Sequence, residues 1–217
     1  MYYGNDWISK LERKFRKYAI PNLPKIIVSA MVFVYISNMF PDFALSPHIY
    51  FVRALIFRGE IWRIISFIFL PPAAGIIFIF FALYFFWMMA SSLENEWGTF
   101  KFNLFYFCGV LGTIIGGFIM GYATNHYLYL SLLFAFAFMF PNFEIRLFFI
   151  LPLKIKYLAY ANAVLMGFMF ISENAAGRVS LLISLINVAI FFGGNAKGML
   201  QRHMRRAKWK RNFKMHK

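Results

Sequence analysis

The sequence from Phe102 to Phe143 reads FNLFYFCGVLGTIIGGFIMGYATNHYLYLSLLFAFAFMFPNF and contains no Asp, Glu, Lys or Arg. A helix needs roughly 20 mostly apolar residues to cross a bilayer, so this stretch is too long for one crossing and long enough for two. A polar break from Tyr122 to His126 lies near its middle. The stretch therefore predicts two membrane-spanning helices joined by a short turn.

Apolar stretches on both sides predict four more spans: Ile26–Phe40, about Gly75–Leu93, about Leu151–Ser172, which is entered through Lys154 and Lys156, and Val179 to about Ala196. We expect an all-α membrane protein with six transmembrane helices at residues 25–196. A basic amphipathic segment at residues 1–24 precedes this domain, and a basic tail at residues 197–217 follows it.

The composition excludes several classes of protein. Hydrophobic residues make up 61% of the chain and charged residues only 14%, with a mean hydropathy of +0.63. A soluble chain is about half apolar and a quarter charged, so this one has too few polar side chains to cover a water-facing surface. A secreted disulfide scaffold is excluded as well, because Cys108 is the only cysteine. The composition is typical of an integral membrane protein.

The net charge of +15 is concentrated near the ends of the chain. Of 23 Lys and Arg residues, six lie between Lys10 and Lys25 and nine between Lys197 and Lys217. Basic clusters that flank spans fix topology and contact anionic lipid head groups, so we expect lipid partners and no nucleic acid. With six spans, nineteen of these residues fall on the side of the termini and four on the other, which predicts that both termini are cytoplasmic.

The N-terminal segment has the pattern of a helix that lies along a membrane surface. Trp7, Leu11, Phe15 and Tyr18 recur at helical spacing, and basic residues occupy most of the positions between them. In the tail, Trp209 and Phe213 are four residues apart among basic residues, which favours the same kind of contact.

The segment from Pro41 to Pro72 is apolar and yet contains several charges, among them Arg53, Arg58 and Arg63. A water-exposed loop would not carry so many large apolar side chains. The pattern predicts a first outer loop that dips into the membrane, with Trp62 at the interface and Glu60 neutralising Arg58 or Arg63.

Within this segment, Gly59-Glu60-Ile61-Trp62-Arg63 resembles the Trp-Arg signature in the first loop of rhomboid and rhomboid-like (derlin-type) membrane proteins. Further stretches resemble the family in the same order: Lys10 to Leu23, Leu93–Gly98 followed by Phe100 and Phe102, Met139–Asn142, Phe149–Tyr157 and Gly193-Gly194. The resemblance covers nearly the whole chain. It implies a six-helix rhomboid-like bundle in a bacterial plasma membrane.

Active rhomboids cut substrate helices with a serine and histidine dyad, and the sequence departs from the family at every chemical position. By the resemblance, the serine position falls near Asn125 and His126 and the histidine position near Phe191. The positions of the oxyanion donors fall near Phe78 and Ala82. The resemblance therefore implies a pseudoprotease with no catalytic residues, which binds transmembrane segments of client proteins without cleaving them.

Two other functions are compatible with a polytopic membrane protein, and the residues disfavour both. An active intramembrane serine protease with non-standard residues would use Ser131 and His126, but side chains five residues apart on a helix point about 140° apart. We expect Ser131 to bond to its own backbone one turn back. A transporter or channel ranks last, because such proteins usually carry ionisable residues inside their spans and none lies in the middle of these six.

Candidate site residues of two kinds remain. Trp62, Arg63, Asn162 and Asn187 are candidates for facing substrate or lipid, although hydrogen bonds across the bundle are the favoured interpretation of the two asparagines. A second set is expected to let helices pack closely: Gly112, Gly116, Gly117 and Gly121. Four histidines without ligand spacing and one cysteine predict no metal, and nothing in the sequence indicates a cofactor.

Overall fold

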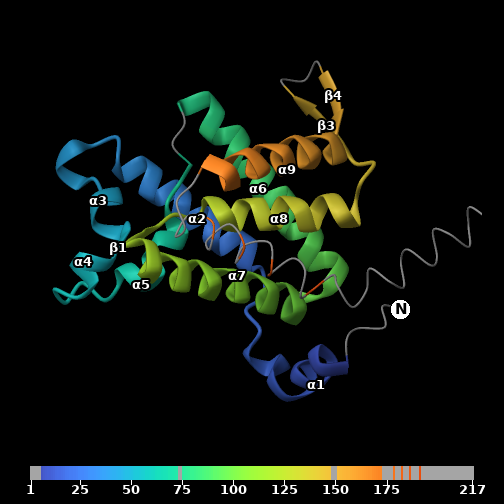
Figure 1. Ribbon diagram of the computed structural model, residues 1–217, viewed down its shortest axis with the longest axis horizontal. Coiled ribbons are helices and arrows are strands. Elements are labelled where there is room, and N and C mark those ends of the chain that lie inside the picture. Colours follow the sequence, from blue (N-terminus) through green and yellow to red (C-terminus); the bar gives the residue numbers. More distant parts are fainter. Residues whose placement is uncertain are drawn as a thin grey trace, which may run out of the picture.

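The computed structural model describes residues 6–72, 75–147 and 151–172, together with Arg178, Leu182, Ile186 and Phe191. Five long helices in this part of the chain form a bundle (Figure 1): α2 (Leu23–Ser37), α6 (Ile76–Trp97), α7 (Thr99–Met120), α8 (His126–Met139) and α9 (Ile155–Ser172). α8 lies at the centre, because it contacts α6, α7 and α9 and eight of its 14 residues are buried. α2 packs against α6.

By length and composition, α6, α7 and α9 can each cross a membrane, with 22, 22 and 18 residues. α2 gives a fourth candidate if it forms one span with Lys10–Tyr18, from which it is bent by 49°. The helical membrane architecture is therefore confirmed for the described residues. The count of six spans is not confirmed, since α2 and α8, with 15 and 14 residues, are shorter than a full crossing requires and the expected sixth span, Val179 to Ala196, lies mostly outside the described residues.

The first long helix begins and ends three residues earlier than the predicted Ile26–Phe40. It begins at Leu23 because Pro24 is accepted in the first turn, where a missing backbone N–H leaves no hydrogen bond unmade. It ends before Asn38, whose side chain is bonded to a residue further along the chain. Asn38 Nδ2 lies 2.6 Å from Ser46 Oγ, and its Oδ1 accepts the backbone N–H of Ser46 at 3.1 Å.

The prediction that the fifth helix starts near Leu151 is wrong. Residues Leu151–Lys154 form strand β4, which pairs antiparallel with β3 (Glu144–Leu147), and α9 starts only at Ile155. Lys154 Nζ lies 3.9 Å from Glu144 Oε1 at the base of this hairpin. Figure 1 shows the two strands beyond the ends of α8 and α9.

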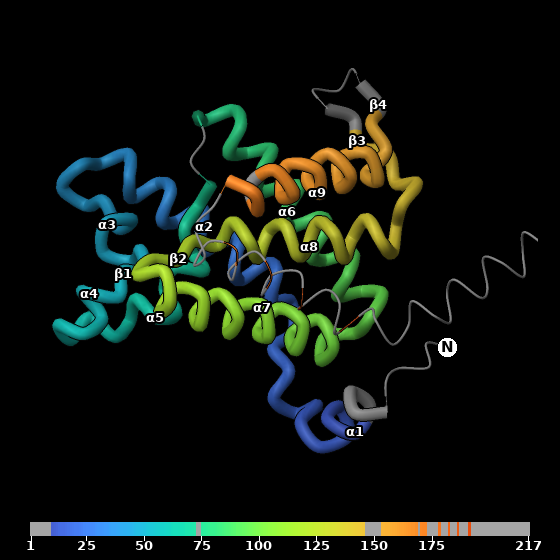
Figure 2. The backbone as a smooth tube through the Cα atoms, viewed as in Figure 1, coloured from blue at the N-terminus to red at the C-terminus, as the bar shows by residue number. Residues whose placement is uncertain are grey.

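Residues 41–70, called the 41–70 segment below, contain six short elements: η2 (Pro41–Phe43), α3 (Ser46–Ile49), β1 (Phe51–Val52), α4 (Arg53–Ile56), α5 (Arg63–Ser66) and η3 (Phe67–Phe69). The tube in Figure 2 leaves α2, passes through this segment at one end of the bundle and then enters α6. β1 pairs antiparallel with β2 (Tyr122–Ala123), so the 41–70 segment is joined to the turn between α7 and α8.

The N-terminal residues form α1 (Asp6–Phe15) and the single turn η1 (Arg16–Tyr18), which confirms the helix expected there. In the view of Figure 1, α1 lies below the bundle near the start of α7.

Aromatic side chains dominate the core, with Phe51, Phe67, Phe102, Phe105 and Phe136 almost completely buried. The outer faces of the helices carry exposed apolar side chains such as Phe80 on α6 and Phe168 on α9, as expected for surfaces in contact with a lipid bilayer.

Candidate functional site

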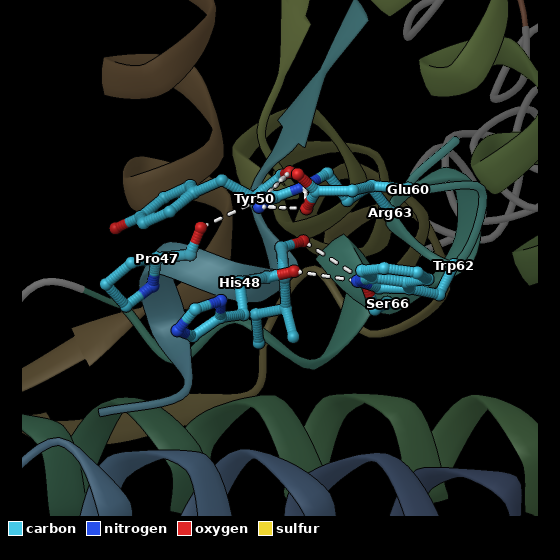
Figure 3. A network of polar contacts seen from close by, with 8 residues as sticks. Pro47, His48, Tyr50, Glu60, Trp62, Arg63 and Ser66 are labelled. Carbon is cyan, nitrogen blue, oxygen red and sulfur yellow. Dashed lines mark hydrogen bonds and ion pairs between the residues drawn. The ribbon is translucent and has the colours of Figure 1, made fainter. Parts of the chain in front are cut away.

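The most elaborate polar arrangement in the described residues surrounds Arg63, whose residue is only 3% exposed (Figure 3). Its Nε and Nη2 donate to Glu60 Oε2 at 2.7 and 2.6 Å. Its Nη1 donates to the backbone oxygens of Pro47 and Tyr50 at 2.9 and 3.0 Å. A buried guanidinium is stabilised when it is paired and its other N–H groups are bonded, and here it is paired with Glu60 while Nη1 makes two further bonds. The ion pair expected for Glu60 is thus formed with Arg63.

Two neighbours of Arg63 complete the same arrangement. Trp62 Nε1 donates to the backbone oxygen of His48 at 3.1 Å, and Ser66 Oγ donates to that of Ile49 at 3.2 Å. The carbonyl groups at the end of a helix have no partner within the helix. The four successive carbonyls from residue 47 to residue 50, at the end of α3, all receive side-chain donors from α5 or from the residue before it.

Arg53 joins the 41–70 segment to the end of α7. Its Nη1 donates to the backbone oxygen of Phe118 at 2.7 Å, and its backbone N–H donates to that of Gly121 at 2.8 Å. A cation near the last turn of a helix is favoured by the helix dipole. Gly121 ends α7 with φ of 93°, a backbone conformation that favours glycine.

A second buried polar cluster lies at the start of α8. Asn125 is 7% exposed, and its Nδ2 donates to the backbone oxygen of Leu70 at 2.6 Å and lies 3.5 Å from that of Ile68. The hydroxyl of Tyr129 lies 3.1 Å from the same Nδ2 and 3.3 Å from the Leu70 oxygen. These bonds hold the end of the 41–70 segment against α8 and give the buried carbonyl of Leu70 its donors.

Ser131 and His126, the pair that an alternative serine protease would use, make their contacts with other residues. Ser131 is 4% exposed, and its Oγ donates to the backbone oxygen of Leu128 at 2.9 Å, within its own helix. The His126 ring lies edge-on to the ring of Tyr127, with 5.7 Å between centroids. Ser131 has the hydrogen bond expected from the sequence, and the arrangement provides no activated hydroxyl.

The remaining candidate residues are dispersed. Trp62 is 54% exposed and Arg63 is buried beside it. Asn162 donates from Nδ2 to the backbone oxygen of Leu158 at 2.9 Å, within α9, while Asn187 lies outside the described residues.

Of the four candidate packing glycines, Gly117 faces β1 and β2 and not a helix backbone. A Cβ atom there would lie 2.7 Å from Cε1 of Phe51 and 2.8 Å from Cβ of Ala123. Gly116 is buried and Gly112 is half-buried on the same helix. Close helix packing at these two glycines stays a prediction.

The structure also describes residues at the positions that the resemblance assigns to the catalytic histidine and to an oxyanion donor. Phe191 is 8% exposed and packs edge-on to Phe105, with 5.2 Å between ring centroids. Phe78 is 57% exposed on α6. Among the described residues, no group of three or more His, Cys, Asp or Glu side chains is placed to hold a metal ion.

The sequence interpretation missed the roles of Asn125, Tyr129 and Ser66. One signal was present: Asn125 is a polar residue in an uncharged stretch, with a tyrosine one helical turn later. Its partner carbonyls at Ile68 and Leu70 are 57 and 55 residues away, and sequence spacing does not identify such partners.

Three described helices that are long and apolar enough to cross a membrane define this chain as a helical integral membrane protein. No protein-family model and no curated protein matches its sequence.

Proposed function

We propose that this protein is a rhomboid-like pseudoprotease that binds transmembrane segments of client proteins without cleaving them. It would lie in a bacterial plasma membrane with both termini in the cytoplasm and with anionic lipid head groups at its basic ends. The proposal rests on the hydrogen bonds of the polar side chains near the start of α8, which are structural bonds and leave no activated nucleophile. The Ser131 hydroxyl is bonded to its own helix, and the Asn125 amide is bonded to the 41–70 segment.

The short helices support a second part of the proposal, local thinning of the bilayer. α2 has 15 residues and α8 has 14. At 1.5 Å per residue these helices are about 22 and 21 Å long, against roughly 30 Å for the hydrocarbon core. A short span is accommodated by thinning the bilayer, and exposed Arg58 beside exposed Phe57 would draw head groups and water inward.

Client contact is proposed along α9, which packs mainly on α8 and β4 and carries the half-buried Asn162. Leu165 on the same helix is 58% exposed. In a membrane, another helix approaching this surface gains close packing and hydrogen bonds, which are the main sources of helix association in lipid.

Photocrosslinking of the reconstituted chain tests this proposal. Benzoylphenylalanine would replace Leu165 on α9, and a matched control would carry it at Phe33 on α2, which is 66% exposed. The expected result is crosslinking of single-span client helices from position 165 and at most weak crosslinking from position 33. Equal crosslinking from both positions, or none from either, would contradict client binding at α9.

A further inference from the structure

α1 and η1 present a cationic face near the start of α7, whereas the 41–70 segment with the Arg63 network contacts the end of that helix. We propose that residues Lys10–Tyr18 bind anionic phospholipid head groups as a defined surface, and that three polar contacts transmit this binding to the turn between α6 and α7. The inference rests on the proposed lipid contact at the basic ends and deepens it. It does not depend on client capture.

Cations and aromatic rings alternate on this surface. Lys14 Nζ lies 5.4 Å from the ring centroid of Phe15, and Lys17 Nζ lies 4.9 Å from that of Tyr18. Phe15 is 39% exposed and Tyr18 is 68% exposed. A surface that offers cations beside exposed rings matches the head-group layer, where rings enter the acyl boundary and cations pair with phosphates.

The acidic side chain within Lys10–Tyr18 is bonded to the rest of the molecule. Glu12 is the one acidic residue between Lys10 and Lys25, and its Oε2 lies 3.6 Å from Lys101 Nζ on α7. Among the side chains that the structure describes, no carboxylate lies within ion-pair distance of Lys14 or Lys17. The exposed cations are thus uncompensated, and their charge favours an anionic partner.

Two further contacts fix the link between η1 and α2. The Asn103 side chain on α7 is buried, and its Nδ2 donates to the backbone oxygen of Ile20 at 3.0 Å. The backbone N–H of Asn22, which has a positive φ of 55°, donates to Glu94 Oε1 on α6 at 3.1 Å. With the Glu12–Lys101 pair, these contacts lie on both sides of the α6–α7 turn. Lipid bound at α1 therefore stabilises that turn, because it binds the folded arrangement and not the unfolded chain.

The test uses the full chain, first in detergent titrated with phosphatidylglycerol or phosphatidylcholine and followed by native mass spectrometry. Lys14→Gln/Lys17→Gln removes two exposed cations and should weaken phosphatidylglycerol binding about 30-fold. Lys154→Gln/Lys156→Gln removes two cations from another part of the chain and should leave that affinity within about threefold. The proposal is overturned if both double variants bind phosphatidylglycerol equally, or if the wild type does not prefer it over phosphatidylcholine.

The coupling of lipid binding to the α6–α7 turn is tested by thermal unfolding in nanodiscs with and without phosphatidylglycerol. Nanodiscs expose both leaflets, so the result does not depend on the orientation of the protein. Wild type should gain several degrees in Tm from the anionic lipid. Glu12→Gln keeps every cation but breaks the pair with Lys101, so the lipid affinity of the folded chain should fall towards that of the unfolded chain and most of the Tm gain should be lost. An unchanged gain in Glu12→Gln would overturn the coupling.

Nucleic acid is the other anionic partner to separate from lipid. If polyuridylate binds the wild type and displaces phosphatidylglycerol, and the Lys14→Gln/Lys17→Gln variant loses this binding, the surface belongs to RNA and the lipid proposal is overturned. Success or failure of the crosslinking from Leu165 bears on none of these outcomes.

Discussion

The ring of Phe51 lies directly over Gly117, so that a Cβ atom at position 117 would come within 2.7 Å of the ring carbon Cε1. Phe51 also meets Phe67 and Phe118 edge-on, with 5.8 and 5.3 Å between ring centroids. This contact joins β1 in the 41–70 segment to α7. The segment is therefore packed against α7 by an aromatic side chain as well as by the bonds of Arg53 to Phe118 and Gly121.

Gly117→Ala should destabilise the protein by about 1–3 kcal/mol, because the added methyl group overpacks the contact with Phe51 and Ala123. The matched control is Gly167→Ala on α9, where a Cβ atom meets nothing within 4 Å. That control should be neutral or slightly stabilising, since alanine favours helix. Thermal unfolding in detergent measures both, and equal Tm values for the two variants would show that position 117 has room.

Arg63→Met should destabilise the protein by about 3–5 kcal/mol, because it leaves the Glu60 carboxylate and the carbonyls of Pro47 and Tyr50 without their donor. Arg58→Met is the control, since Arg58 is exposed in the same segment, and its effect should stay within about 0.5 kcal/mol. Limited proteolysis of the 41–70 segment in nanodiscs reports the difference. Cleavage at the same rate in both variants would mean that the Arg63 network does not hold the segment.

Asn125→Leu should destabilise the protein by about 1–3 kcal/mol, because the buried carbonyl of Leu70 loses its closest donor. Tyr129→Phe keeps the bond from Asn125 to Leu70 and should cost less, about 1 kcal/mol. Denaturant unfolding in mixed micelles ranks the two variants. A larger effect from Tyr129→Phe than from Asn125→Leu would assign the main bond to the tyrosine.

The sequence predicted the features that depend on local composition. Uncharged stretches located α6 and α7 well, and the spacing of Leu11, Phe15 and Tyr18 predicted the N-terminal helix. The Glu60–Arg63 pair was also among the expected pairs, because its members are three residues apart. The contact of Lys101 with Glu12 has no such local signal, since it depends on the fold bringing α1 beside the start of α7.

The features that were missed depend on distant contacts or on backbone pairing. Gly117 faces Phe51 and Ala123, which are paired between β1 and β2. The helical spacing of the glycines alone predicted a neighbouring helix at this position. The β3–β4 hairpin replaced the first turn of an expected helix, because Leu151–Lys154 satisfies its backbone across to Glu144–Leu147, with Pro152 opposite Arg146. Hydropathy carries no signal for such pairing in an apolar stretch.

The central claim is that the chain holds transmembrane segments and does not cut them, and a cleavage assay tests it most directly. Purified, reconstituted protein would be incubated with a panel of single-span substrates beside an active rhomboid control, with Ser131→Ala and His126→Ala variants run in parallel. The account predicts intact substrates for the wild type and both variants, and a change in stability within about 1 kcal/mol for Ser131→Ala, whose hydroxyl only bonds its own helix. Cleavage by the wild type that either substitution abolishes would contradict the account and identify a new catalytic pair.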